Sequence, residues 1–144
     1  MSDDLKTLYN ETIRLHNDRP FHFQKKGETS TVRAYNPVCG DRFDFYIKHE
    51  DKRIVEIHFH GFGCAISKAS ASMLSQWLTG LDDAKAITLC MQFLDFLESN
   101  SDKPQVTLPE ELHAFGPVHN FPERHDCVSQ AWKELLIYLE SKEK

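Results

Sequence analysis

The sequence lacks an apolar run of roughly 18 residues, the length that a membrane-spanning helix requires, so we expect no membrane partner. It also lacks an excess of basic residues: 17 lysines and arginines stand against 22 aspartates and glutamates, a net charge of −5. This balance disfavours contacts with a phosphate backbone, and we expect no nucleic-acid partner. Repeats are absent as well, and a hydrophobic content of 40% excludes wholesale disorder. We therefore expect a single domain over residues 1–144.

The first residues, Met1-Ser2-Asp3-Asp4, are acidic and polar, unlike a signal or transit peptide. We therefore expect a cytoplasmic protein, in a compartment that keeps thiols reduced. The sequence has four cysteines, at positions 39, 64, 90 and 127. In that compartment cysteines are interpreted as metal ligands, nucleophiles or core residues before disulfides are considered.

Three segments in the first half of the chain have the pattern of β-strands. A short strand is predicted over Thr31–Tyr35, followed by two segments, near 43–48 and 55–60, in which apolar and polar residues alternate. In the first of the two alternating segments Phe43, Phe45 and Ile47 are expected to face the core, and in the second Val55, Ile57 and Phe59. The polar tract between the two segments can turn the chain, which predicts an antiparallel hairpin with one wet face.

The remaining segments have the pattern of helices. A first helix is predicted from about Asp4 to His16. A last one is predicted from about Arg124 to Ser141, with its inward stripe formed by Val128, Ala131, Trp132, Leu135 and Leu139. Two more lie between them, one ending near Gly80 and one beginning at Asp82, whose apolar stripe is expected to comprise Ile87, Cys90, Met91, Leu94 and Leu97. Residues 99–117 are predicted to be mostly loop, with a helical turn at Glu110–Ala114. Segregation of strands and helices predicts an α+β fold, with helices on one face of a small three-stranded antiparallel sheet.

Three of the four cysteines lie where an element is expected to begin or end. Cys39 and Asp41 flank Gly40 in a turn before the first long strand, Cys64 lies at a strand-to-helix turn, and Cys127 lies in the first turn of the last helix. If these ends converge, they form a Cys₃Asp site, and such thiolates select zinc, copper(I) or iron–sulfur chemistry. Cys90 lies in the middle of a predicted helix and is interpreted as a core residue.

Histidines offer other candidate ligands. His58 and His60 share one face of a predicted strand with Glu56, so they are either a metal pair or part of a solvated sheet face. Among the later histidines, His125 is close enough in sequence to affect Cys127.

Two motifs resemble a known family. They are Asn36-Pro37-Val38-Cys39-Gly40-Asp41 and the run from Gly61 to Met73, which reads Gly-Phe-Gly-Cys-Ala-Ile-Ser-Lys-Ala-Ser-Ala-Ser-Met. With a third cysteine opening a C-terminal helix, they resemble the IscU/NifU-type iron–sulfur scaffold family over roughly Leu5 to Leu139. The long stretch before Cys127 and the run Val118-His119-Asn120-Phe121-Pro122-Glu123-Arg124-His125-Asp126-Cys127 are most similar to the SufU branch.

This resemblance implies an IscU-like fold and a site whose metal ligands are Cys39, Asp41, Cys64 and Cys127. It implies a SufS-like cysteine desulfurase as partner, together with downstream cluster-assembly proteins. SufU-type members carry Zn²⁺ and accept persulfide sulfur, so the protein would be a sulfurtransferase-like carrier and not a conventional turnover enzyme. We expect Cys39 to be the persulfide acceptor, because a loop moves more easily than a helix start.

Two alternatives remain open. Instead of accepting sulfur, the protein could be a scaffold that assembles and transfers a [2Fe–2S] cluster on the same residues. It could also be a structural zinc-binding module, whose metal only stabilises the fold. The chain also departs from the IscU branch, because the Leu-Pro-Pro-Val-Lys motif is missing and Asp126 replaces the histidine before the third cysteine.

Overall fold

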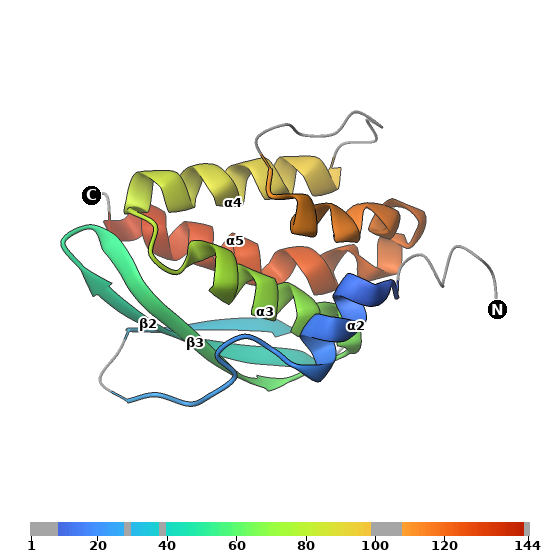
Figure 1. Cartoon of the computed structure of the whole chain (residues 1–144), viewed down its shortest axis with the longest axis horizontal. Helices are drawn as coiled ribbons and strands as arrows, with labels where there is room; N and C mark the ends of the chain where they lie inside the picture. Colours follow the sequence, from blue (N-terminus) through green and yellow to red (C-terminus); the bar gives the residue numbers. More distant parts are fainter. Residues whose placement is uncertain (1–8, 28–29, 38–39, 99–107, 143–144) are drawn as a thin grey trace.

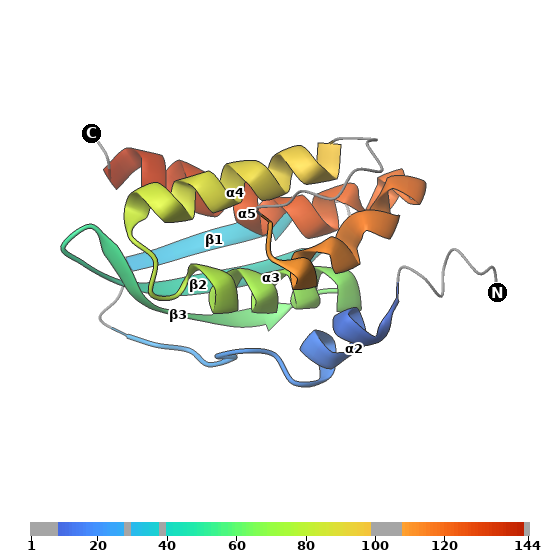
Figure 2. The ribbon, with the colours of Figure 1, turned by 45° about the horizontal axis from the view of Figure 1, so that its top comes forward.

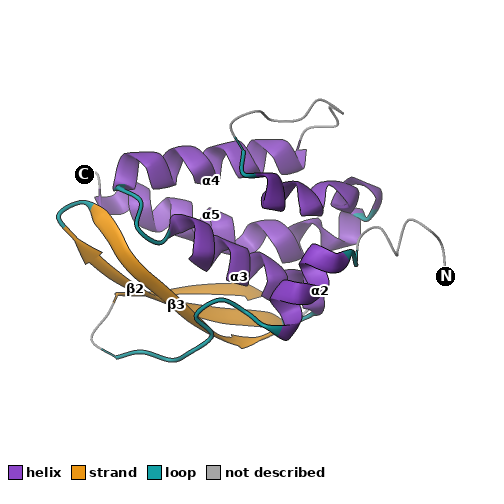
Figure 3. Cartoon of the chain, viewed as in Figure 1, coloured by secondary structure: helices purple, strands orange, loops and turns teal. Residues whose placement is uncertain are grey.

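The computed structural model describes residues 9–27, 30–37, 40–98 and 108–142. Three antiparallel strands form its sheet in the order β1-β2-β3, with bounds Ser30–Asn36, Asp41–Glu50 and Arg53–Phe62. Helices cover one face of this sheet, as Figures 1 and 3 show. The predicted α+β fold, with helices on one side of a three-stranded sheet, is therefore confirmed.

A register shift in the hairpin changes which residues of β3 face the core. Lys48 pairs with Glu56 and His49 pairs with Ile54, so Val55 is an extra residue on β3. Ile54 is fully buried, whereas Val55 is only partly buried, and the predicted inward position of Val55 is wrong. A β-bulge interrupts the two-residue alternation that the prediction assumed.

The helical layer has two helices against the sheet and one further out. Helix α3 (Ala65–Leu78) contacts β3, and α5 (His125–Lys142) contacts β1. Helix α4 (Asp83–Glu98) packs on α5, on the side away from the sheet (Figures 1 and 2). The largest fully buried side chains come from both layers: Phe45, Phe59, Phe93, Phe115 and Trp132. In the described part of the chain, no helix is both long and apolar enough to span a membrane.

Helix α4 buries a different stripe from the one predicted. Cys90 and Leu97 are buried as expected, but Met91 is 57% exposed and Phe93 is fully buried. Apolar residues lie around most of this helix, so their spacing does not select one face. Packing against α5 and the segment after residue 108 selects it.

Helix α2 is shorter at its start than predicted. It spans Glu11–Asp18, and Asn10 caps it by accepting a hydrogen bond from the Ile13 N–H at 3.1 Å. Asn10 has extended backbone dihedrals, so the helix begins at the next residue. The predicted start at Asp4 lies outside the described residues, but the predicted helix through Tyr9 and Asn10 is wrong.

The described part of the segment predicted to be mostly loop, residues 108–117, is largely 3₁₀-helical. The 3₁₀ helix η1 spans Glu110–Asn120, and a second one, η2, spans Pro122–Arg124. Leu112, Phe115 and Val118 are all fully buried and recur every third residue. This three-residue spacing matches the 3₁₀ repeat, which keeps the three side chains on one face.

Candidate metal centre

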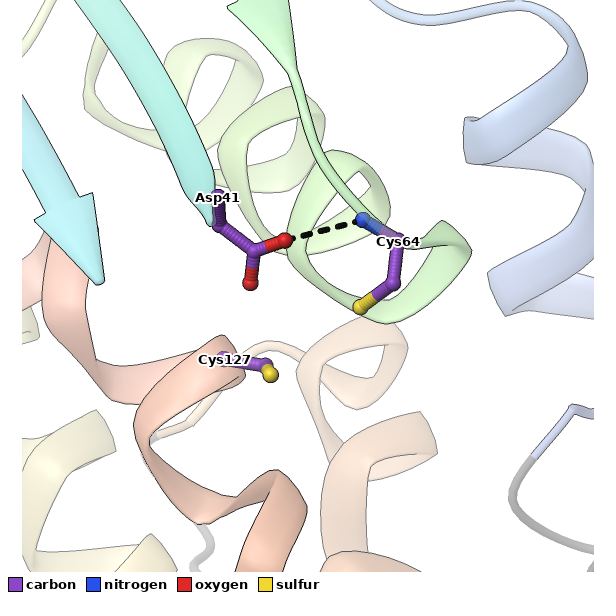
Figure 4. A group of neighbouring side chains, drawn as sticks. All are labelled: Asp41, Cys64 and Cys127. Atoms are coloured by element: carbon purple, nitrogen blue, oxygen red, sulfur yellow. Dashed lines mark hydrogen bonds between the residues drawn. The ribbon is translucent and has the colours of Figure 1, made fainter. Parts of the chain in front are cut away.

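Asp41, Cys64 and Cys127 meet where three elements begin (Figure 4). Asp41 is the first residue of β2, Cys64 caps the N-terminus of α3, and Cys127 lies in the first turn of α5. Their ligand atoms all lie within 4.8 Å of one another. Among the described residues, no other group of three His, Cys, Asp or Glu side chains meets this criterion.

The turn from β3 into α3 requires glycine at two positions. Gly61 has φ = +150°, and a Cβ there would lie 2.1 Å from the Arg42 carbonyl oxygen. A Cβ on Gly63 would lie 2.8 Å from Asp41 Oδ1 and 2.4 Å from Ser67 Oγ. Neither position has room for a side chain, so the strand exit can press Cys64 against the start of β2.

Backbone hydrogen bonds orient two of the three side chains. The Cys64 N–H donates to Asp41 Oδ1 at 3.0 Å, and the Ser67 N–H donates to Cys64 Sγ at 3.4 Å. Asp41 is only 5% exposed, and its Oδ2 is buried with no hydrogen-bond partner among the described residues. A buried carboxylate oxygen without a partner destabilises the folded state. It therefore indicates that a cation or a hydrogen-bond donor binds at this position.

The electrostatics of the centre favour a thiolate at Cys64. A hydrogen bond with Cys127 lowers the pKa of Cys64 to about 5, against the effect of burial and with help from Ser67. Soft thiolates together with a carboxylate oxygen suit Zn²⁺, which takes four such ligands in tetrahedral geometry. The three described donors therefore fit a zinc ion, with one position left for a fourth ligand.

Arg124 is a component of the centre that the sequence analysis missed. Burial acts to lower its pKa, but Tyr9, Cys64 and Cys127 outweigh this effect and raise it. The guanidinium therefore lies close to both sulfurs and stabilises their negative charge. Arg124 belongs to a Pro-x-Arg-x-x-Cys pattern, and this spacing is the signal that could have identified it.

Cys39 lies outside the described residues, so its place relative to the other three is a prediction. The described ends of its loop are close together, because the Gly40 N–H donates to the Asn36 carbonyl at 2.7 Å. Gly40 has φ = +76°, a conformation that favours glycine.

Cys90 is a core residue, as predicted. It is fully buried, and burial raises the pKa of its thiol to about 12.

The histidines predicted as candidate ligands do not join the centre. His58 is only 9% exposed and stacks on His22 with ring centroids 4.4 Å apart, so it is not part of a solvated face. Among the described residues, no group of three candidate ligands includes His58 or His60. His125 turns toward Glu98, with 3.4 Å between its Nε2 and a carboxylate oxygen. Both results depend on contacts with segments distant in sequence.

Comparison with known families adds independent information. The NifU-like N terminal domain family matches residues 8–127. The chain is 32% identical over 132 residues to the zinc-dependent sulfurtransferase SufU of Bacillus subtilis, covering 92% of this chain and 89% of that protein. It is also 32% identical over 131 residues to the iron–sulfur cluster assembly scaffold protein IscU of Streptococcus pyogenes, covering 91% and 82%.

A solved structure has the same fold. It is described as an iron–sulfur cluster assembly scaffold protein for the SUF system, from Fervidobacterium islandicum AW-1. It superposes with a TM-score of 0.84 at 25% identity, covering 93% of this chain and 98% of that one.

Proposed function

The chain belongs to the NifU-like N-terminal domain family, and from this premise we propose that it is a zinc-bound acceptor of persulfide sulfur in iron–sulfur cluster assembly. The observation that carries the proposal is the convergence of Asp41, Cys64 and Cys127, with an unpaired carboxylate oxygen among them. The relative from Bacillus subtilis, named a zinc-dependent sulfurtransferase, supports the choice of metal and chemistry. The sulfur donor would be a SufS-like cysteine desulfurase, in the cytoplasm, and the whole chain would act as a single domain.

Four residues would hold the zinc ion: Cys39, Asp41, Cys64 and Cys127. Bound zinc keeps thiolates deprotonated and protects them from oxidation. A carboxylate exchanges more readily than a thiolate on a soft metal, which makes Asp41 the labile ligand of the set. Arg124 would balance the negative charge of the sulfurs when a ligand leaves.

The proposed step is a sulfur transfer without net oxidation. The Cys39 thiolate attacks the outer sulfur of the enzyme's cysteine persulfide, and a new S–S bond forms on Cys39. The S–S bond of the donor breaks, and its cysteine leaves as a thiolate. The proton of the terminal S–H stays with the transferred sulfur, so atoms and electrons balance.

A second function uses the same residues. The relative from Streptococcus pyogenes is named a scaffold protein for iron–sulfur cluster assembly, and thiolates with one carboxylate can also hold a [2Fe–2S] cluster. The two functions differ in metal content. Anaerobically purified protein should be colourless with about one zinc per chain; brown protein with matching iron and sulfide would favour the scaffold.

Sulfide release by the cognate desulfurase tests the acceptor function. The unaltered chain should accelerate release, and mass spectrometry should find one added sulfur on Cys39. Cys39→Ala should abolish both effects without unfolding the protein. Cys90→Ser is the matched control, because Cys90 is a buried thiol away from the centre, and it should retain both. Full stimulation by Cys39→Ala would make Cys127 the acceptor candidate. If neither the unaltered chain nor its variants change sulfide release by a desulfurase, the structural zinc module is favoured.

A further inference from the structure

Three exposed side chains form a row across the outer face of the sheet. Tyr35 of β1 pairs with Arg42 of β2, and Arg42 pairs with Phe62 of β3. Phe62 is 64% exposed and Tyr35 is 53% exposed, and the Arg42 side chain is also exposed. Directly paired residues on one face of a sheet have their Cβ atoms within about 5.5 Å, so the three side chains form a continuous patch. We call these three residues the rim row.

The rim row borders the metal centre. Arg42 follows the candidate ligand Asp41 directly, and Phe62 precedes the candidate ligand Cys64 by two residues. Strand alternation directs Asp41 inward and Arg42 outward, so the ligand and the row lie on opposite faces of the same strand end. Because Arg42 and Phe62 lie within two residues of candidate ligands, a protein that approaches the centre at this end of the sheet can contact the rim row.

The charge around the rim row is positive, although the chain as a whole carries −5. Asp44 lies on the same face of β2 and is held by Arg33, with 2.7 Å between Arg33 Nε and Asp44 Oδ1. Arg33, Arg42 and Lys25 all lie close enough to lower the pKa of Asp44. One carboxylate therefore faces three cations, and this region is complementary to an acidic surface.

We propose that the rim row is a docking surface for the sulfur-donating enzyme, which meets Arg42 with carboxylates and the two aromatic rings with apolar surface. The proposal depends on the proposed function, because it takes the sulfur donor as the occupant. Two observations select that occupant. The donor's persulfide must reach the metal centre that the row borders, and tyrosine and arginine are the residue types that contribute most to protein interfaces.

Calorimetric titration of the cognate cysteine desulfurase with the chain as purified tests this surface directly. Arg42→Glu should weaken binding at least about tenfold and reduce its dependence on salt, because the variant repels the carboxylates that Arg42 attracts. Phe62→Ser should weaken binding by a similar factor. Lys48→Glu is the matched control: it reverses an exposed charge on the same strand and face, further from the centre, and should leave binding within about twofold.

Metal content and sulfide release are measured on every variant. The proposal expects unaltered metal content, and full stimulation once Arg42→Glu saturates the enzyme. Unchanged affinity of both Arg42→Glu and Phe62→Ser would overturn the docking surface while the proposed function stands, and so would absence of binding by the unaltered chain. If the unaltered chain binds but neither stimulates the enzyme nor gains sulfur, the proposed function fails, and the variants still decide the surface.

Discussion

Gly63 occupies a position between the carboxylate of Asp41 and the first turn of α3. A Cβ there would approach Ser67 Oγ to 2.4 Å, and Asp41 Oδ1 and the Phe43 ring to 2.8 Å. These contacts are shorter than van der Waals distances, so a side chain here must displace the side chains of Ser67, Asp41 and Phe43 or shift the strand exit. The candidate metal centre therefore depends on a residue that holds no metal.

We expect Gly63→Ala to destabilise the fold by about 1–3 kcal/mol, the usual effect of overpacking, and to lower zinc content. Urea unfolding and metal analysis measure the two effects. Gly116→Ala is the control, because a Cβ at Gly116 meets Phe96 at 3.6 Å, an ordinary contact. Normal zinc content in a stable Gly63→Ala protein would show that the centre tolerates movement of Asp41.

Cys64 and Cys90 should differ in reactivity once metal is removed. With a pKa of about 5, Cys64 is a thiolate above that pH and a thiol below it. Its alkylation rate should therefore fall less than about twofold between pH 8 and pH 6, whereas an ordinary thiol loses roughly fiftyfold or more. Cys90, fully buried with a pKa of about 12, should not react in the folded protein.

Alkylation by iodoacetamide after chelation, followed by mass spectrometry of each cysteine, measures these rates. A steep fall in the rate at Cys64 toward pH 6 would contradict the proposed effect of Cys127 and Ser67 on its thiolate.

A partly buried polar network joins α2, α3 and η1. The His16 ring lies 2.6 Å from Ser72 Oγ and 3.0 Å from Glu111 Oε1, and the Trp77 indole N–H donates to the same Glu111 oxygen at 3.1 Å. The order serine, histidine, carboxylate is that of a hydrolase triad. Ser72 is fully buried, however, and accepts a hydrogen bond from the Phe21 N–H at 2.8 Å, so the network has a structural role.

Glu111→Ala should destabilise the protein by about 1–3 kcal/mol, because it leaves the Trp77 and His16 donors without their acceptor. Urea unfolding gives the free energy. Glu110→Ala removes the exposed neighbouring carboxylate and should change stability by less than about 0.5 kcal/mol. Equal stabilities of the two variants would show that water replaces Glu111 at no cost, and zinc content should be normal in both.

At the scale of the whole molecule, the candidate metal centre brings together parts of the chain that are distant in sequence. Its described candidate ligands come from β2, α3 and α5, at positions 41, 64 and 127. A ligand bound only to the folded state stabilises that state by mass action. A metal held by these residues would therefore join one end of the sheet to both helices that cover it.

Chelation of zinc should lower the melting temperature. At a free zinc concentration about one hundred times Kd, binding contributes about 2.7 kcal/mol, which corresponds to roughly 5–10 °C for a chain of this size. Scanning calorimetry with and without chelator measures the shift. Cys64→Ser provides the control, since a protein that has already lost the metal should show no further change on chelation. An unchanged melting temperature of the unaltered chain would contradict zinc binding by the folded state.

The sequence by itself determined the order of elements and the faces of those with a clear period. The core positions of α5, among them Val128, Trp132 and Leu135, were predicted correctly because apolar residues recur at helical spacing along one stripe of that helix. The alternation in β2 likewise predicted its buried face. The motifs around Asp41, Cys64 and Cys127 identified the candidate ligands. Metal binding requires thiolate or carboxylate side chains, and in two of these motifs such a side chain lies next to a glycine of a turn.

Only the tertiary structure decided the features that depend on neighbours. The bulge that buries Ile54 comes from strand pairing, the exposure of Met91 from helix packing, and the cover over His58 from a contact with His22. The approach of Arg124 to two sulfurs also requires the folded chain. Local periodicity reflects contacts within one element, whereas these positions are set by contacts between elements far apart in the sequence, and such contacts leave no regular pattern in it.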